Sequence, residues 1–224
     1  MKYKSIALDG PSGAGKSTMA KRLAAELGFL YVDTGAIYRT LGLFALRQGV
    51  DPGDSEAVEP LLEKATIRMA YAEDGLQHMY LDAEDVTQAI RTPEVSSAAS
   101  KISAIPAVRA FLLEMQRDMA RKNNVVMDGR DIGTVVLPQA DMKIFLVASV
   151  EARAQRRYAE LRERGVETNL DQVLVEIKER DQRDSGRSTA PLRQAEDAHL
   201  VDTTEYSLEE SFQSLLRLVR EKLG

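Results

Sequence analysis

Short apolar runs and longer stripes of helical period alternate along this chain. The apolar runs predict buried strands, and they lie at residues 5–9, 29–32, 125–127, 142–147 and 200–202. After most of these runs, apolar residues recur every three or four positions, which predicts amphipathic helices. Strands that alternate with helices typically form a parallel sheet covered by helices on its faces. The pattern therefore predicts an α/β fold with a parallel sheet and flanking helices.

One segment in the first half of the chain has a different period. Apolar positions alternate over residues 67–71, Asp74-Gly75 is a typical hairpin turn, and the chain returns through residues 79–81. We expect a small antiparallel unit inserted into the alternating pattern. Nothing in this unit indicates catalysis, and His78 is expected to face solvent.

Two later helices carry finer local signals. Pro106 is expected to open a helix whose apolar stripe includes Phe111. Thr168 and Asp171 resemble a capping box at the start of another helix, and that helix is expected to bury Leu170.

Composition narrows the class of protein. Of the 224 residues, 44% are hydrophobic and 29% are charged, as is usual for a globular enzyme. The net charge of -5 offers no basic face for nucleic acid. There is no cysteine, and His78 and His199 lack ligand-spaced partners, so disulfides and zinc are not expected. Without a signal sequence or a membrane-spanning run, we expect a cytoplasmic protein that binds no membrane.

The most informative stretch follows the first predicted strand. It reads Gly-Pro-Ser-Gly-Ala-Gly-Lys-Ser-Thr and fits the phosphate-binding pattern G-x-x-x-x-G-K-[ST]. Glycines let the backbone N–H groups turn inward around anionic oxygens, and the following helix adds its N-terminal dipole. The residues expected to hold nucleotide phosphates are Gly10, Pro11, Ser12, Gly13, Ala14, Gly15, Lys16, Ser17 and Thr18.

Side chains near this loop have distinct expected roles. Lys16 contributes a positive charge at the terminal phosphates, and Thr18 can bond the innermost phosphate. The Ser17 hydroxyl is placed to ligate Mg²⁺. Asp128, which ends a later buried strand, is expected to be a direct or outer-sphere partner of the same ion.

A second anion site is expected at the ends of the other strands, where ligands of doubly wound sheets bind. Thr34 and Arg39 follow the second predicted strand and are candidates for it. Arg130 and Asp131 form a charged turn after Asp128, which indicates either a ligand site or a local ion pair. Arginine is also concentrated over residues 153–187, as either a mobile clamp over phosphates or a solvated, salt-bridged helix pair.

These features favour a small-molecule kinase. A guanine-nucleotide switch would need an Asn-Lys-x-Asp base reader, which the sequence lacks, and a motor ATPase would need a longer chain. A kinase needs a second anion pocket and an arginine-rich lid, and the sequence offers both. The alternatives that stay open are a kinase for another acceptor, such as UMP, and a nucleotide-binding switch without catalysis.

Several blocks of sequence resemble bacterial cytidylate kinases, and the resemblance runs nearly from end to end. Many kinases share the phosphate loop, but Asp-Gly-Arg-Asp at 128–131 and Lys-Glu-Arg-Asp at 178–181 are more specific. The resembling blocks are residues 10–18, 33–39, 90–95, 128–134 and 177–192.

The resemblance implies a P-loop fold in which ATP, with Mg²⁺, phosphorylates CMP or dCMP. It also implies a monomer with a core of residues 1–34 and 106–224, a CMP-binding insert of residues 35–105, and a short lid near residues 153–165. By matching position, Ser100, Arg109, Asp131 and Arg187 would read cytosine, Arg39, Arg130 and Arg180 would hold the CMP phosphate, Asp184 would meet the ribose, and Arg157 would approach ATP. The expected catalytic residues are Lys16, Asp128, Arg130 and Arg180. Without the resemblance, Ser100 and Arg109 look like ordinary surface residues of helices.

Overall fold

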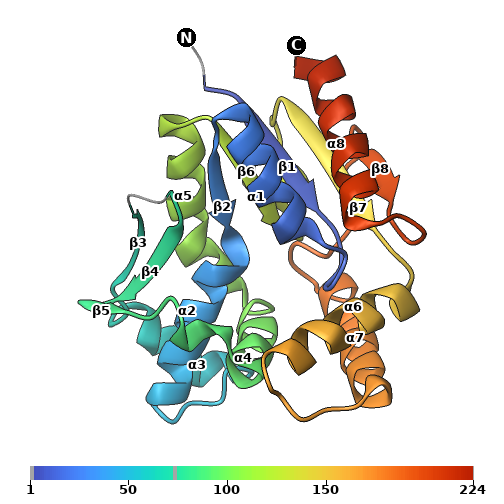
Figure 1. The fold of residues 1–224 in the computed structure, drawn as a ribbon. Coiled ribbons are helices and arrows are strands. Elements are labelled where there is room, and N and C mark those ends of the chain that lie inside the picture. Colours follow the sequence, from blue (N-terminus) through green and yellow to red (C-terminus); the bar gives the residue numbers. More distant parts are fainter. Residues whose placement is uncertain (1–2, 73–74, 224) are drawn as a thin grey trace.

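The computed structural model describes residues 3–72 and 75–223. Within them, the main sheet is parallel and has the strand order β2-β6-β1-β7-β8 (Figure 1). The strands are β1 (Ser5–Asp9), β2 (Leu30–Asp33), β6 (Val125–Gly129), β7 (Met142–Val147) and β8 (His199–Asp202). The first strand in the sequence therefore lies at the centre of the sheet. The predicted α/β fold with a parallel sheet is confirmed.

Helices cover both faces of this sheet. Side chains alternate along a strand, so Ile6 and Leu8 pack against α1 and α8, whereas Ala7 and Met127 lie on the other face with α5. The helices are α1 (Lys16–Leu27), α2 (Thr34–Arg47), α3 (Ser55–Leu62), α4 (Pro93–Ile102), α5 (Pro106–Lys122), α6 (Val150–Glu163), α7 (Leu170–Ser185) and α8 (Leu208–Leu223). Two short helices, η1 (Ala89–Arg91) and the π-helix η2 (Ile132–Val136), complete the described elements.

The predicted antiparallel unit is confirmed as a small sheet of β3 (Ile67–Tyr71), β4 (Gln77–Leu81) and β5 (Glu84–Asp85). The expected turn residue Asp74 lies outside the described residues. Together with α2, α3 and α4, this sheet encloses a hydrophobic core that reaches Val108 and Leu112 of α5. A second buried core thus lies beside the one that supports the main sheet.

The capping box of α7 begins one residue later than the predicted pair Thr168 and Asp171. Asn169 has extended backbone and accepts a 2.9 Å hydrogen bond from the Gln172 backbone, while the Gln172 side chain accepts one from the Asn169 backbone. The helix therefore starts at Leu170, since the third helical residue closes the box. In the first turn Leu170 is 38% exposed, so its expected burial was wrong.

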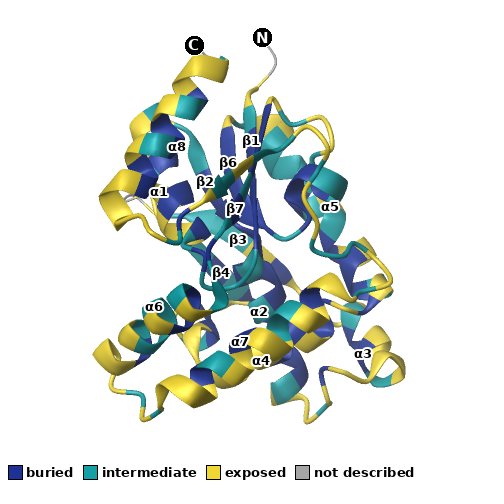
Figure 2. Ribbon diagram, turned by 90° about the vertical axis from the view of Figure 1, so that its right-hand side faces the viewer, coloured by how far each residue is buried: buried dark blue, intermediate teal, exposed yellow. Residues whose placement is uncertain are grey.

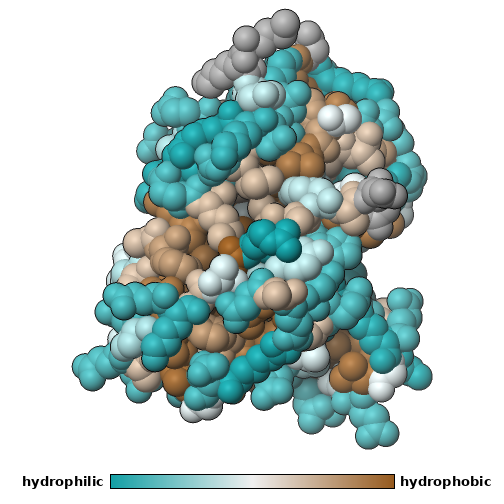
Figure 3. All heavy atoms as spheres, turned by 90° about the vertical axis from the view of Figure 1, so that its left-hand side faces the viewer, coloured by the Kyte–Doolittle hydropathy of each residue, from teal (hydrophilic) through white to brown (hydrophobic). Residues whose placement is uncertain are grey.

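Burial and hydropathy follow this layered arrangement. β1, β6 and β7 lie buried in the middle of the molecule, while α3, α4, α6 and α7 keep exposed outer faces (Figure 2). On the face that Figure 3 shows, hydrophobic residues gather between two hydrophilic regions.

Among the described residues, no helix has both the length and the apolar character needed to cross a membrane.

Candidate active site

A cavity of about 570 Å³ opens beyond the carboxyl ends of the central strands, a volume typical of small-molecule sites. Its walls come from the phosphate loop, α2, α4, α5, the turn after β6, α6 and α7. Most of the candidate residues line it: Ser12, Gly13, Gly15, Lys16, Ser17, Thr18, Thr34, Arg39, Ser100, Arg109, Asp128, Arg130, Asp131, Arg157, Arg180, Asp184 and Arg187. Gly10, Pro11 and Ala14 belong to the loop but lie outside the lining. The fold thus gathers at one place residues that are far apart in the sequence.

The phosphate loop wraps tightly around the end of β1. Gly10 has φ +149°, and a Cβ atom there would lie 2.0 Å from the Leu146 carbonyl oxygen, so only glycine fits. Lys16 donates a 2.6 Å hydrogen bond to the Pro11 carbonyl. Burial, with Arg130 nearby, lowers the pKa of Lys16 well below its usual value. Cationic groups are thus crowded at the loop end of the cavity, and an anion bound there would favour the charged form of Lys16.

Asp128 organises the polar side chains beside the loop. Its carboxylate accepts a 2.8 Å hydrogen bond from the Ser17 hydroxyl and a 2.9 Å hydrogen bond from the Tyr31 hydroxyl. Burial, and then the nearby charge of Asp33, raise the pKa of Asp128 to about 6. A cation beside Asp128 and Ser17 would relieve this cost. The expected pair of oxygen donors is thus brought together, and Tyr31 is a partner that the sequence analysis missed.

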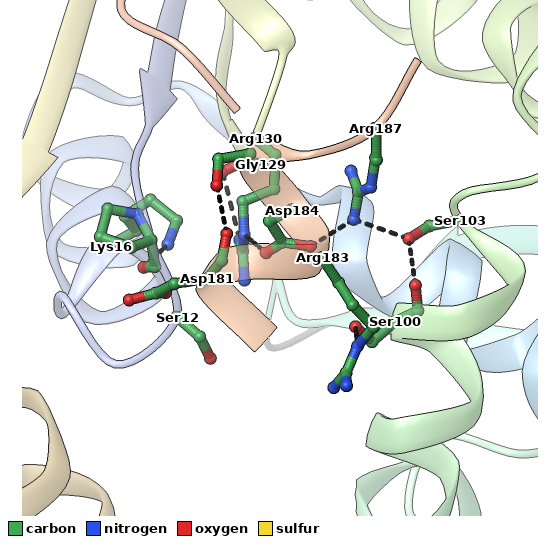
Figure 4. Close-up of polar contacts among 12 residues, drawn as sticks. Ser12, Lys16, Ser100, Ser103, Gly129, Arg130, Asp181, Arg183, Asp184 and Arg187 are labelled. Carbon is green, nitrogen blue, oxygen red and sulfur yellow. Dashed lines mark hydrogen bonds and ion pairs between the residues drawn. The ribbon is translucent and has the colours of Figure 1, made fainter. Parts of the chain in front are cut away.

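An arginine–aspartate–arginine chain lies in the wall of the cavity (Figure 4). Arg130 donates a 2.8 Å hydrogen bond to Asp184, and Arg187 pairs with the other oxygen of the same carboxylate. Although burial opposes ionisation, Arg130 and Arg187 hold the pKa of Asp184 below its usual value. Arg187 also donates a 2.8 Å hydrogen bond to the hydroxyl of Ser103, the C-cap residue of α4. Asp184 therefore fixes the orientation of two of the candidate arginines.

Arg180 differs from these arginines because it makes no hydrogen bond or ion pair with any residue that the structure describes. Its Nε atom is buried without a partner. Burial, and then the charge of Arg130, lower the pKa of Arg180 to about 9. The guanidinium of Arg180 is buried at an energetic cost, and its N–H donors are free in the cavity. Such a group is suited to bind an anion.

Ser100 and Arg109 are buried in the cavity wall, so the interpretation as surface residues was wrong. Arg109 is 8% exposed and forms an ion pair with the equally buried Asp131. Ser100 accepts a 3.3 Å hydrogen bond from Arg183 of α7. Phe111, expected in the buried stripe, is instead 40% exposed. Arg109 is the α5 residue that lines the cavity, and no local pattern in the sequence indicates this.

Asp33 holds the start of α2 in place. One carboxylate oxygen accepts a 2.9 Å hydrogen bond from the Ala36 backbone, and the other pairs with Arg39 at 2.7 Å. Gln77 of the small sheet bonds both the N–H (2.7 Å) and the carbonyl (3.2 Å) of Asp33. The small sheet thus positions the arginine end of α2. Sequence reasoning missed Asp33 and Gln77, because Gln77 precedes the predicted strand of residues 79–81 and only the fold shows that it is buried.

Two arginines of α6, Arg153 and Arg157, differ in their surroundings. Arg153 is buried, pairs with Asp181 at 2.6 Å and donates a 3.0 Å hydrogen bond to the Ser12 carbonyl. It therefore stabilises the phosphate loop and does not line the cavity. Arg157 pairs with Glu160 at 2.8 Å and lines the cavity. The expectation of a phosphate clamp therefore does not extend to Arg153.

Comparison with known proteins identifies the family to which this chain belongs. The family model for cytidylate kinase matches residues 6–221. The chain belongs to the cytidylate kinase family. Its curated relatives include the cytidylate kinase of Caldicellulosiruptor bescii, which is 50% identical over 97% of this chain and 96% of the relative. The cytidylate kinase of Solibacter usitatus is 52% identical over 97% of this chain and 93% of the relative.

Solved structures that resemble this cytidylate kinase family member are more distant in sequence. A gluconokinase from Sinorhizobium meliloti has a TM-score of 0.50 at 14% identity, covering 100% of this chain and 96% of that one. An uncharacterised protein from Eubacterium ventriosum has a TM-score of 0.51 at 11% identity, covering 97% and 98%. At such identities the likeness concerns the fold alone.

Proposed function

We propose that this chain transfers the terminal phosphoryl group of ATP to CMP or dCMP, giving ADP and CDP or dCDP. The observation that carries this proposal is Arg180, a cation without a partner among the described residues, in the same cavity as the phosphate loop. The phosphate loop can bind the polyphosphate of one nucleotide, and the unpartnered Arg180 can bind a second anion in the same cavity. A nucleotide switch needs only the phosphate loop, whereas a kinase needs both sites.

The donor and the acceptor occupy opposite ends of the cavity. The phosphates of ATP lie in the loop of residues 10–18, against Lys16 and the N-terminus of α1, with Arg157 above them. The CMP phosphate lies between Arg39, Arg130 and Arg180, and the ribose hydroxyls lie at Asp184. In this arrangement residues 35–105 are the CMP-binding insert, residues 153–165 are the lid, and the rest is the core.

Cytosine is read by Ser100, Arg109, Asp131 and Arg187. Cytosine carries an amino donor at N4 where uracil carries an oxygen. Asp131 accepts from that donor, and its pairing with Arg109 orients the carboxylate. With UMP, the same carboxylate faces an oxygen in a buried site, and such mismatches are rejected by up to roughly 10⁴-fold.

The reaction needs no protein nucleophile. An oxygen of the CMP phosphate attacks the terminal phosphorus of ATP in line, and the bond to the leaving ADP oxygen breaks through a loose transition state. Lys16, Arg130 and Arg180 neutralise the two approaching anions and hold them aligned. Closure of the lid excludes water, which would otherwise accept the phosphoryl group.

Mg²⁺ fits the oxygen donors beside the loop. Ser17 and the buried Asp128, whose pKa burial raises, are side chains that would hold the ion directly or through water. When bound, it supplies charge neutralisation on the phosphates of ATP.

The wider setting follows from the substrates. We place the enzyme in the cytoplasm, acting as a monomer on free nucleotides and not on nucleic acid. The excess of acidic residues over the whole chain supports the last point, since the cationic residues named above gather inside the cavity.

A coupled ADP-release assay tests the proposal, with ATP and Mg²⁺ and with CMP, dCMP, UMP and AMP offered in parallel. Rapid turnover of CMP and dCMP alone is expected. Turnover of UMP or AMP at a similar rate would reject the assignment of the base-reading residues. Binding of ATP without turnover of any acceptor would favour the switch instead.

A further inference from the structure

A buried carboxylate at the end of β1 takes no part in the mechanism above. Asp9 is 4% exposed and directly precedes the phosphate loop. Its Oδ1 accepts a 2.8 Å hydrogen bond from the backbone N–H of Ile132, and its Oδ2 accepts a 2.7 Å bond from that of Gly133. Both carboxylate oxygens are thus used on one short stretch of backbone more than 120 positions away in the sequence.

That stretch is the start of the π-helix η2, and its N-cap residue is Asp131. The Asp131 backbone has φ -145° and ψ 26°, outside the regular helix and strand regions, and its side chain makes no capping bond. The first N–H groups of a helix need acceptors, and here Asp9 of a different strand supplies them. Asp9, at the end of the neighbouring strand β1, therefore holds the backbone that directs Asp131 toward Arg109.

We propose that Asp9 is a positioning residue for base selection, which holds the turn that carries Asp131 and so links the phosphate-loop strand to the choice between cytosine and uracil. The inference rests on the proposed function and extends it, since Asp9 itself touches no substrate. The register of the sheet supports it, because Asp9 lies directly beside Gly129, two residues before Asp131. A shift of this turn would move the Asp131 carboxylate against the base.

The surroundings of Asp9 make its two hydrogen bonds to this turn sensitive to pH. Burial raises the pKa of Asp9 to about 7, with Asp131 adding to the rise and Lys16 opposing it. Arg130 also faces this carboxylate, whereas Lys143, which lies beside Gly133, pairs with Asp197 at 2.8 Å. Above about pH 7 the ionised carboxylate accepts from both N–H groups, and below it the protonated form is a weaker acceptor. The turn is therefore held more firmly on the alkaline side.

The test measures kcat and KM for CMP, UMP and ATP in the unaltered enzyme and in Asp9→Asn. The amide retains one acceptor and turns an N–H₂ toward a backbone N–H, so it releases one side of the turn. We expect the ratio of kcat/KM for CMP to that for UMP to fall about tenfold, with KM for CMP raised and KM for ATP within about twofold. The matched control is Asp141→Asn. Asp141 accepts a 2.8 Å hydrogen bond from the Ser5 backbone at the other end of β1, and its replacement should leave the ratio unchanged.

A pH series supplies the second readout. Between about pH 6 and pH 8 the CMP to UMP ratio of the unaltered enzyme should rise, while that of Asp9→Asn stays flat. The phosphates of CMP and UMP titrate alike and cancel in the ratio. If Asp9→Asn fails to fold, Asp9→Glu, which keeps a carboxylate but displaces its oxygens by one methylene, is measured in its place, and a CMP to UMP ratio equal to that of the unaltered enzyme rejects the inference.

Other results also separate the possibilities. An unchanged ratio in a folded Asp9→Asn, or a raised KM for ATP alone, would mean that Asp9 supports only the phosphate loop, and the inference would be wrong. A pH-dependent ratio that persists in Asp9→Asn would assign the titration to another group. Failure of the unaltered enzyme to phosphorylate CMP would instead reject the proposed function, and that result is distinct from any outcome with the variant.

Discussion

Ser17 donates a 2.8 Å hydrogen bond to Asp128, although the two residues are 111 positions apart. The bond joins the first turn of α1 to the end of β6, at the point where the phosphate loop meets the rest of the cavity. Tyr31 holds the other oxygen of the same carboxylate at 2.9 Å. The carboxylate is therefore oriented from two sides before any ligand binds, as a preorganised site requires.

Replacing Asp128 tests its role with Mg²⁺. In Asp128→Asn we expect kcat to fall about 10²-fold, since one oriented charge near the phosphates is lost. The concentration of Mg²⁺ that gives half-maximal rate should rise as well. The control is Asp54→Asn, because Asp54 is an exposed N-cap of α3 away from the cavity. An Mg²⁺ dependence equal to that of the unaltered enzyme would show that Asp128 does not serve the ion.

Arg180 should show opposite effects on stability and on activity. Its charge is held without a partner among the described residues, and burial disfavours it, so Arg180→Met should leave the melting temperature unchanged or raise it. The same change should lower kcat/KM for CMP about 10²–10⁴-fold. Thermal unfolding and steady-state kinetics measure the two effects. A large loss of stability would contradict the view that Arg180 is kept for an anion.

The Arg130–Asp184–Arg187 chain should make stability depend on acid pH. The folded-state pKa of Asp184 lies below its ordinary 3.8, so the ionised carboxylate stabilises the fold above that pH. This contribution is lost as the pH falls through the folded-state value. At neutral pH, Asp184→Asn leaves two arginines unpaired and should cost about 3–5 kcal/mol.

Melting temperatures from about pH 7 to pH 3 check this sign. The gap between the unaltered protein and Asp184→Asn should narrow as the pH falls below 3.8. A gap that stays constant across the series would mean that Asp184 is not stabilised by these arginines.

Two glycines with positive φ should respond differently to alanine. At Gly10 a Cβ would lie 2.0 Å from the Leu146 carbonyl, whereas at Gly49 (φ +70°) it would meet no atom within 4 Å. Gly49→Ala should cost only the backbone strain, about 1–2 kcal/mol. Gly10→Ala adds a clash and should cost about 2–5 kcal/mol and abolish ATP binding. Denaturant unfolding and ATP titration measure both, and equal costs would contradict the predicted clash.

The sequence by itself determined the strands, the helices and the phosphate loop. Period-two and period-3.6 patterns report which backbone conformation buries apolar groups, and the spacing of Gly10, Lys16 and Ser17 encodes a loop made from consecutive residues. The α/β class followed, as did the candidate positions at strand ends, because parallel strands deliver their carboxyl ends to one edge. Helix starts were off by a residue where the capping pair was misread, as at Asn169.

Only the tertiary structure decided which charged residues are partnered. Arg153 and Arg157 look alike in the sequence, yet one is buried behind the loop and the other lines the cavity. Ser100 and Arg109 look like surface residues of their helices, and their burial depends on α7 and on the turn after β6 packing against them. Several of these pairs, such as Arg109 with Asp131, join groups that are distant along the chain, so local patterns carry no record of them. For that reason, only the fold shows that Arg180 has no partner among the described residues and that Asp9 accepts hydrogen bonds from the turn that follows Asp131.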